Sequence, residues 1–155
     1  MTIALSKRAF LLAAVAAGVL LGLGIFTFIY AEGLSYFGTE SRSCANCHIM
    51  NAQYDSWIKS SHHIVAKCVD CHLPQNPVAK LIAKSVNGYH HSKGFTFQDF
   101  HEPIMIKPHN SRILQEACLG CHSGLVHDIV AGSTTDANAV RCVHCHSSVG
   151  HGPVR

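Results

Sequence analysis

The chain has 155 residues, a formal net charge of +3 and 14% charged residues. Lys7 and Arg8 precede a long apolar run, and the remaining ten basic residues are nearly balanced by nine acidic ones. The chain has no basic run of the kind that binds nucleic acid, so its composition argues against a nucleic-acid-binding protein.

Residues 9–30 contain no charged side chain. As a helix, this run is long enough to cross a hydrocarbon core of about 30 Å. A cleaved signal peptide is the alternative, but its apolar region is typically only about 7 to 15 residues long and ends in a small-x-small site. Because Lys7 and Arg8 favour a cytoplasmic N-terminus, we expect residues 1–30 to be a single-pass anchor in the cytoplasmic membrane. Residues 31–155 would then form one periplasmic domain.

Four segments share the pattern of two cysteines, separated by two residues, with histidine directly after the second. In such a segment both sulfurs form thioethers to haem and the histidine is placed beneath the iron as an axial ligand. Zinc binding and disulfides are the alternatives, but neither requires histidine after every second cysteine. We therefore predict four covalent c-type haems. The four motifs, called motifs 1 to 4 below, are Cys44-Cys47-His48, Cys68-Cys71-His72, Cys118-Cys121-His122 and Cys142-Cys145-His146.

The predicted fold is mainly α, with the transmembrane helix followed by a small haem-packed domain of short helices and loops. A short helix is expected around Trp57, and another begins at Asn76-Pro77, with Gly88 as a possible end. The Gly-, Ser- and Thr-rich tract 131–138 is predicted to be a loop. No alternating stretch is long enough to predict a strand.

Motifs 1 and 2 repeat the spacing of motifs 3 and 4. In each pair the first cysteines are 24 residues apart, and a basic residue, Lys67 or Arg141, directly precedes the second motif. A duplicated di-haem unit is therefore a natural hypothesis. A domain of this size with four haems would draw much of its apolar interior from the macrocycles, so we expect folding to depend on haem attachment.

The number of histidines available as axial ligands indicates whether the haems carry electrons or catalyse a reaction. An iron that only passes electrons has two strong axial ligands, whereas a catalytic iron keeps an open position. Beyond the motif histidines nine remain, so no iron is forced to stay open, and an enzyme with its own catalytic haem is disfavoured. The residues alone would assign His48 to the first iron and leave Met50 as packing. The nine further histidines are His62, His63, His90, His91, His101, His109, His127, His144 and His151.

The single anchor, the four motifs, the length and the Cys47-His48-Ile49-Met50 sequence resemble the NapC/NrfH family of membrane-bound tetrahaem quinol dehydrogenases. The resemblance spans almost the whole chain. It implies that Met50 is the proximal ligand of the first haem, that His63 serves the fourth haem and that His151 serves the third. The distal ligand of the second haem would come from a partner subunit, from His101 or from His109.

The resemblance also implies a quinol pocket next to the first haem, with groups that accept two protons. The family's lysine falls on Lys84, and its second polar residue falls on His91, or on Asn87 or His90 if a gap is introduced. A histidine can accept a proton near neutral pH, but His91 could instead ligate the first iron. A solvated helix end is the plainer interpretation of these residues.

The resemblance therefore predicts oxidation of menaquinol and electron transfer to a periplasmic multihaem reductase, with an ammonia-forming cytochrome c nitrite reductase as first choice. The chain would be the electron-transfer subunit of a complex, which allows it to be oligomeric there, rather than a stand-alone catalyst. Reductases of nitrate or trimethylamine N-oxide are alternative partners. A tethered electron shuttle without a quinol site is the other alternative.

Overall fold

The computed structural model describes residues 6–130 and 141–152, with the side chains of 127–130 left aside, and it divides the chain into two units, Met1–Gly38 and Thr39–Arg155. The described residues form helices and no strands, which confirms the predicted fold class. The boundary after residue 30 that the sequence suggested stays a prediction. The predicted loop 131–138 lies outside the described residues.

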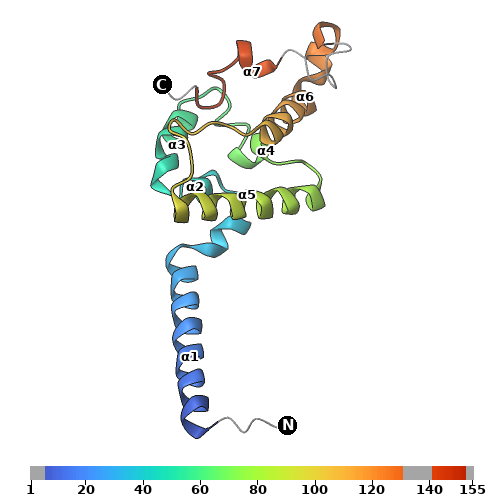
Figure 1. The fold of residues 1–155 in the computed structure, drawn as a ribbon. Helices are drawn as coiled ribbons and strands as arrows, with labels where there is room; N and C mark the ends of the chain where they lie inside the picture. Colours follow the sequence, from blue (N-terminus) through green and yellow to red (C-terminus); the bar gives the residue numbers. More distant parts are fainter. Residues whose placement is uncertain (1–5, 131–140, 153–155) are drawn as a thin grey trace. The chain divides into compact units, whose positions relative to one another are not determined.

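The first unit is dominated by the helix α1 (Lys7–Tyr30), followed by the short 3-10 helix η1 (Gly33–Phe37) (Figure 1). The Ser6 side chain caps α1 by accepting a hydrogen bond from the Ala9 amide at 3.3 Å. At about 1.5 Å per residue, the 24 residues of α1 extend over about 36 Å, enough to span a bilayer. All its side chains are exposed, as expected for a helix that meets lipid on every side.

The second unit places each of the four motifs on or beside a helix. Its elements are α2 (Ser41–Cys44), η2 (His48–Met50), α3 (Asn51–Ile58), α4 (Cys68–His72), α5 (Pro77–Phe97), α6 (Pro108–Val130) and α7 (Cys142–Cys145). Helix α4 packs against both α2 and α6, and α7 packs against α6. The expected short helix around Trp57 is α3, and the Trp57 indole donates a hydrogen bond to the Ala66 carbonyl at 3.1 Å.

The predicted start of α5 is confirmed. The side chain of Asn76 accepts hydrogen bonds from the amides of Val78 (2.9 Å) and Ala79 (3.1 Å), and Pro77 occupies the first turn. The helix does not end at Gly88 but continues to Phe97, where Gln98 adopts a left-handed conformation. A glycine inside a helix costs only about 1 kcal/mol, and no proline follows to stop this one.

The buried apolar core of the described residues is small. It consists of Val69 and Leu73 from the region of α4, Ala83 of α5 and Ile113 of α6. Polypeptide side chains alone therefore enclose little of this unit, as expected for a fold whose interior is completed by haem.

Candidate haem and quinol site

One hydrogen bond recurs in the two pairs of motifs. The Cys68 amide, at the start of motif 2, donates to the Ser41 hydroxyl at 3.1 Å. The Cys142 amide, at the start of motif 4, donates to the Gln115 side-chain oxygen at 3.0 Å. Each acceptor stands three residues before the first cysteine of the preceding motif. This shared contact supports the hypothesis of a duplicated di-haem unit.

The basic residue before the second motif of each pair also has a defined partner. Lys67 pairs with Glu40 at 2.5 Å, although both side chains are largely exposed. Arg141 donates to the Ser111 carbonyl at 3.1 Å. Both basic residues occupy the N-cap position of the short helix that carries the motif, α4 or α7, with extended backbone conformation. Lys67 and Arg141 therefore occupy equivalent positions at the starts of α4 and α7.

The cysteines lie in a row that follows the order of the motifs. Hydrogen bonding to Cys68, followed by burial, raises the pKa of the Cys44 thiol, and the positive charge of Lys84 opposes this effect. The same sulfur contact lowers the pKa of Cys68, with help from the Ser41 hydroxyl.

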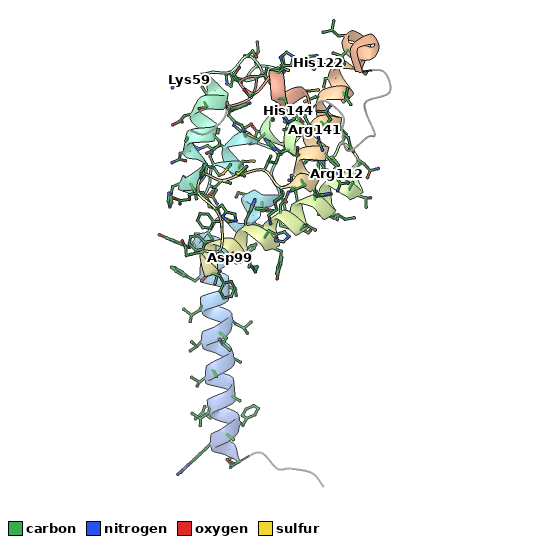
Figure 2. All side chains as sticks on the ribbon, turned by 45° about the horizontal axis from the view of Figure 1, so that its top comes forward. Lys59, Asp99, Arg112, His122, Arg141 and His144 are labelled. Carbon is green, nitrogen blue, oxygen red and sulfur yellow. The ribbon has the colours of Figure 1, made fainter. Side chains whose placement is uncertain are left out.

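The row of cysteines continues from motif 2 into motifs 3 and 4. Burial, followed by the neighbouring Cys118, raises the pKa of Cys71 to about 11, which shows that motif 2 lies close to motif 3. Burial, followed by Cys142, raises the pKa of Cys118, so motif 3 lies close to motif 4. Helix α7, with Arg141 and His144, lies beside α6, which carries Arg112 and His122 (Figure 2). Four cofactors attached here would form one chain from motif 1 to motif 4.

Two pairs of histidine rings have the separation expected for ligands of one iron. Each metal–nitrogen bond is about 2 Å long and each ring centroid lies about 1 Å beyond its nitrogen, so two axial imidazoles have centroids about 6 Å apart. The rings of His72 and His151 are 6.0 Å apart and nearly parallel. The rings of His62 and His122 are 6.1 Å apart and tilted by 62°.

The ligand assignments that the family resemblance implies stay predictions. His151, which the resemblance assigns to the third haem, has its ring 6.0 Å from the nearly parallel ring of His72 in motif 2. His63, which it assigns to the fourth haem, has its ring in edge contact with Trp57 at 5.0 Å. His62 has no role implied by the resemblance. The Nδ1 of His62 lies 3.2 Å from the Val149 carbonyl, and donating to that oxygen would leave Nε2 free for a metal.

His72 is partly buried, and its surroundings favour the neutral imidazole. Burial, followed by the nearby His151, lowers the pKa of His72. Histidine binds a metal only when it is unprotonated, so the environment favours the binding form. The donor set of cysteine pairs and facing imidazoles therefore fits haem c.

The predicted quinol-site residues lie on α5. Lys84 is partly buried and close enough to motif 1 to act on Cys44. Desolvation, followed by the charge of Lys107, lowers the pKa of His91, which favours the neutral imidazole that can accept a proton. The His90 ring is exposed and lies against Tyr89 at 5.5 Å.

The remaining candidate ligands are placed as follows. His48 and Met50 share the single turn η2, with Met50 partly buried and His48 exposed. His101 lies in the segment after α5, His109 lies in the first turn of α6, and both are exposed. His146 follows α7 and is exposed. The choice between His48 and Met50 for the first iron stays a prediction.

Residues 4–116 match the family described as NapC/NirT cytochrome c family, N-terminal region. The chain belongs to this family. Its members are membrane-anchored, and α1 is the one candidate membrane span among the described residues. The eight cysteines are consistent with four haem sites of a multihaem c-type cytochrome.

Two of the following three relatives are at least 30% identical to this chain. The cytochrome c-type protein NrfH of Wolinella succinogenes is 36% identical, over 87% of this chain and 82% of the relative. The cytochrome c nitrite reductase subunit NrfH of Nitratidesulfovibrio vulgaris is 30% identical, over 78% of this chain and 72% of the relative. The cytochrome c-type protein NapC of Escherichia coli K12 is 26% identical, over 88% of this chain and 82% of the relative.

A solved structure supports the fold. The crystal structure of the cytochrome c nitrite reductase NrfHA complex bound to the HQNO inhibitor contains a chain that matches with a TM-score of 0.63. The match covers 92% of both chains at 24% identity. The helical architecture described above is therefore that of NrfH.

Proposed function

We propose that this protein oxidises menaquinol at the outer face of the cytoplasmic membrane and delivers the electrons to a periplasmic, ammonia-forming cytochrome c nitrite reductase. The relatives named NrfH support this partner, because one of them is called a subunit of cytochrome c nitrite reductase. Bound haem c supplies one-electron redox chemistry, and four such groups would connect the quinol site to the reductase.

The observation that carries the proposal is the row of motifs with Lys84 at one end. The cysteines of motifs 1 and 2 are in contact, motif 2 lies close to motif 3, and motifs 3 and 4 interact. Lys84 acts on Cys44, the first cysteine of the row. A donor oxidised beside Lys84 would thus deliver electrons to the first motif, with the later motifs leading away.

Oxidation of one menaquinol releases two protons as well as two electrons, so the site must accept protons. His91 suits this role because its lowered pKa keeps the ring unprotonated near neutral pH. Lys84 supplies a hydrogen-bond donor that can orient a quinol oxygen. We assign both residues to the quinol site, with His90 as a further candidate beside them.

The ring pairs support a proposal for the axial ligands of two haems. We assign His72 and His151 to the second haem and His122 and His62 to the third, because each pair has the required separation of about 6 Å. This assignment gives the second haem a ligand from the chain itself. Met50 for the first haem and His146 for the fourth remain as the family resemblance implies.

The decisive experiment adds menaquinol anaerobically to the purified holoprotein and follows the haem absorption bands, with and without HQNO. HQNO is the inhibitor bound in the related NrfHA complex. Fast reduction that HQNO blocks is expected. Full reduction by dithionite without any reduction by menaquinol would contradict the quinol site and favour a tethered shuttle.

The partner is tested separately by reoxidation. The quinol-reduced protein is mixed with nitrite reductase and nitrite, or with nitrate reductase and nitrate. Rapid reoxidation only in the first mixture is expected. Reoxidation only in the second would replace the proposed partner by a nitrate reductase.

A further inference from the structure

The segment between α3 and α4, residues 59–67, carries the adjacent histidines His62 and His63. We call this segment the histidine loop. Two of its apolar side chains bury little surface, because Ile64 is 84% exposed and Val65 is 74% exposed. A loop with so little apolar burial adopts many conformations unless specific contacts hold it. The contacts that hold the histidine loop therefore decide where its two imidazoles lie.

The side chain of Trp57, in the last turn of α3, closes the histidine loop. Its indole N–H donates a part-buried hydrogen bond to the carbonyl of Ala66, nine residues further on, at 3.1 Å. The amide of Ala66 in turn donates to the carbonyl of His62 at 2.9 Å. The backbone of His62 is therefore linked to α3 through a single intervening residue.

Trp57 also contacts the loop at a second point. Its ring makes an edge contact with the ring of His63, with the centroids 5.0 Å apart. The ring of Tyr54, three residues earlier and thus on the same side of α3, lies 5.7 Å from the indole. The indole is itself supported by α3 and can act as a fixed point for the loop.

The imidazole of His62 is oriented from the other side by a distant segment. Its Nδ1 lies 3.2 Å from the carbonyl of Val149, and its ring lies 6.1 Å from that of His122 in motif 3. The contact with Val149 can fix the orientation of the ring, whereas Trp57 fixes the backbone that carries it. Contacts that orient a metal ligand influence the strength of metal binding almost as much as the ligand itself.

We propose that Trp57 is a positioning residue for His62, the axial ligand that the histidine loop supplies to the third haem. It would act through the loop backbone, by reducing the number of conformations from which His62 has to reach the iron. The inference rests on the ligand assignment made under the proposed function and does not depend on quinol oxidation. It predicts that His62 detaches from the iron more often when the contacts of Trp57 are removed.

The test uses the full-length holoprotein and its Trp57→Phe and Trp57→Ala variants. Carbon monoxide binding to the dithionite-reduced protein measures ligand detachment, because this gas requires an open axial position. Trp57→Phe keeps a ring beside His63 and loses the hydrogen bond to Ala66, so binding at one haem should become about fivefold faster. Trp57→Ala loses both contacts and should give a larger increase. In the oxidised Trp57→Ala protein, electron paramagnetic resonance should show a partial high-spin signal from the same haem.

Two further variants make the result specific. His62→Ala identifies the haem concerned, and Ile64→Ala is the matched control, because it shortens an exposed side chain of the same loop and should change neither measurement. Unchanged haems in both Trp57 variants, or a change in a haem other than the one that His62→Ala alters, would overturn the proposal.

A merely structural role of Trp57 would give a different result. Loss of all four haems in both Trp57 variants, or an equal change in every haem, would show such a role and overturn the proposal. If His62→Ala itself altered no haem, the ligand assignment on which the inference rests would fail. Reduction of the unsubstituted protein by menaquinol tests the proposed function separately.

Discussion

The two motif pairs of the second unit share a scaffold but differ in what surrounds them. In both, the amide that opens the second motif donates to a side chain three residues before the first motif, Ser41 or Gln115. Motif 1, however, begins at the last residue of the four-residue helix α2 and lies near Lys84, whereas motif 3 is built into the 23-residue helix α6. The two pairs therefore share one contact at the start of their second motif and differ around their first motif. Under the proposed function, this difference would separate an entry end for electrons from an exit end.

Histidines from each half also lie near a motif of the other half. The ring of His62, from the first half of the unit, lies 6.1 Å from that of His122 in motif 3, and the ring of His151, from the second half, lies 6.0 Å from that of His72 in motif 2. Under the proposed ligand assignment, each half therefore depends on the other for a ligand.

The largest expected effect comes from removing a thioether in either pair. Cys47→Ser and Cys121→Ser should each leave a haem loosely held and cause the protein to be degraded, because the macrocycles complete the interior. Haem staining and immunoblots of membranes measure both effects, with Ser123→Ala as control. A stable tri-haem protein at normal abundance, in either variant, would contradict this dependence.

Substitutions near motif 1, where electrons are proposed to enter, should affect reduction by quinol and not reduction by dithionite. His91→Ala should slow menaquinol oxidation by about 100-fold, the usual contribution of a proton acceptor, and leave reduction by dithionite unchanged. Stopped-flow absorbance measures both rates. His144→Ala, in motif 4 at the other end of the row, is the matched control and should change neither. Equal slowing with both reductants would remove His91 from the quinol site.

The proposed ligand assignment can be tested at neighbouring positions. His62→Ala should convert one haem from low spin to high spin, because the third iron loses a strong ligand, while His63→Ala should leave all spin states unchanged. Electron paramagnetic resonance of the oxidised protein distinguishes the two. The opposite result would exclude His62 as a ligand and support His63, which the family resemblance assigns to the fourth haem.

The pH dependence of quinol oxidation should respond to Lys107. Below its pKa His91 is protonated and cannot accept a proton, so the rate should fall on the acid side. Lys107→Gln removes a positive charge that lowers this pKa, so the pKa should rise and the acid limb should move to higher pH, by less than about one unit. Lys93→Gln, which breaks the ion pair with Asp99, should leave the limb in place. Identical pH–rate profiles for Lys107→Gln and the unsubstituted protein would exclude this coupling.

The smallest effect is expected from the shared hydrogen bond. Ser41→Ala and Gln115→Ala should each reduce stability by about 1 kcal/mol, because a part-buried amide loses its acceptor. Thermal melting of the holoprotein should show a similar decrease for both, and little for Ser85→Ala, whose hydroxyl bonds within exposed α5. A large difference between the first two variants would show that the two pairs are not equivalent.

Several features could be predicted from the sequence because they depend on neighbouring residues. The spacing of cysteine and histidine within each motif identified haem c, and the uncharged run identified α1. Asn76-Pro77 predicted the start of α5 correctly, since a cap acts on the next few amides. The end of α5 was missed, because one glycine neither requires nor forbids a helix end.

The tertiary structure alone decided which side chains meet. The sequence offered nine histidines beyond the motifs without showing which of them lie near one another. The structure brings the ring of His62 to 6.1 Å from that of His122, and the ring of His151 to 6.0 Å from that of His72. The sequence thus determined the cofactor and the anchor through local chemistry. The approach of these histidines was decided only by the tertiary structure, because each pair joins residues far apart in the chain.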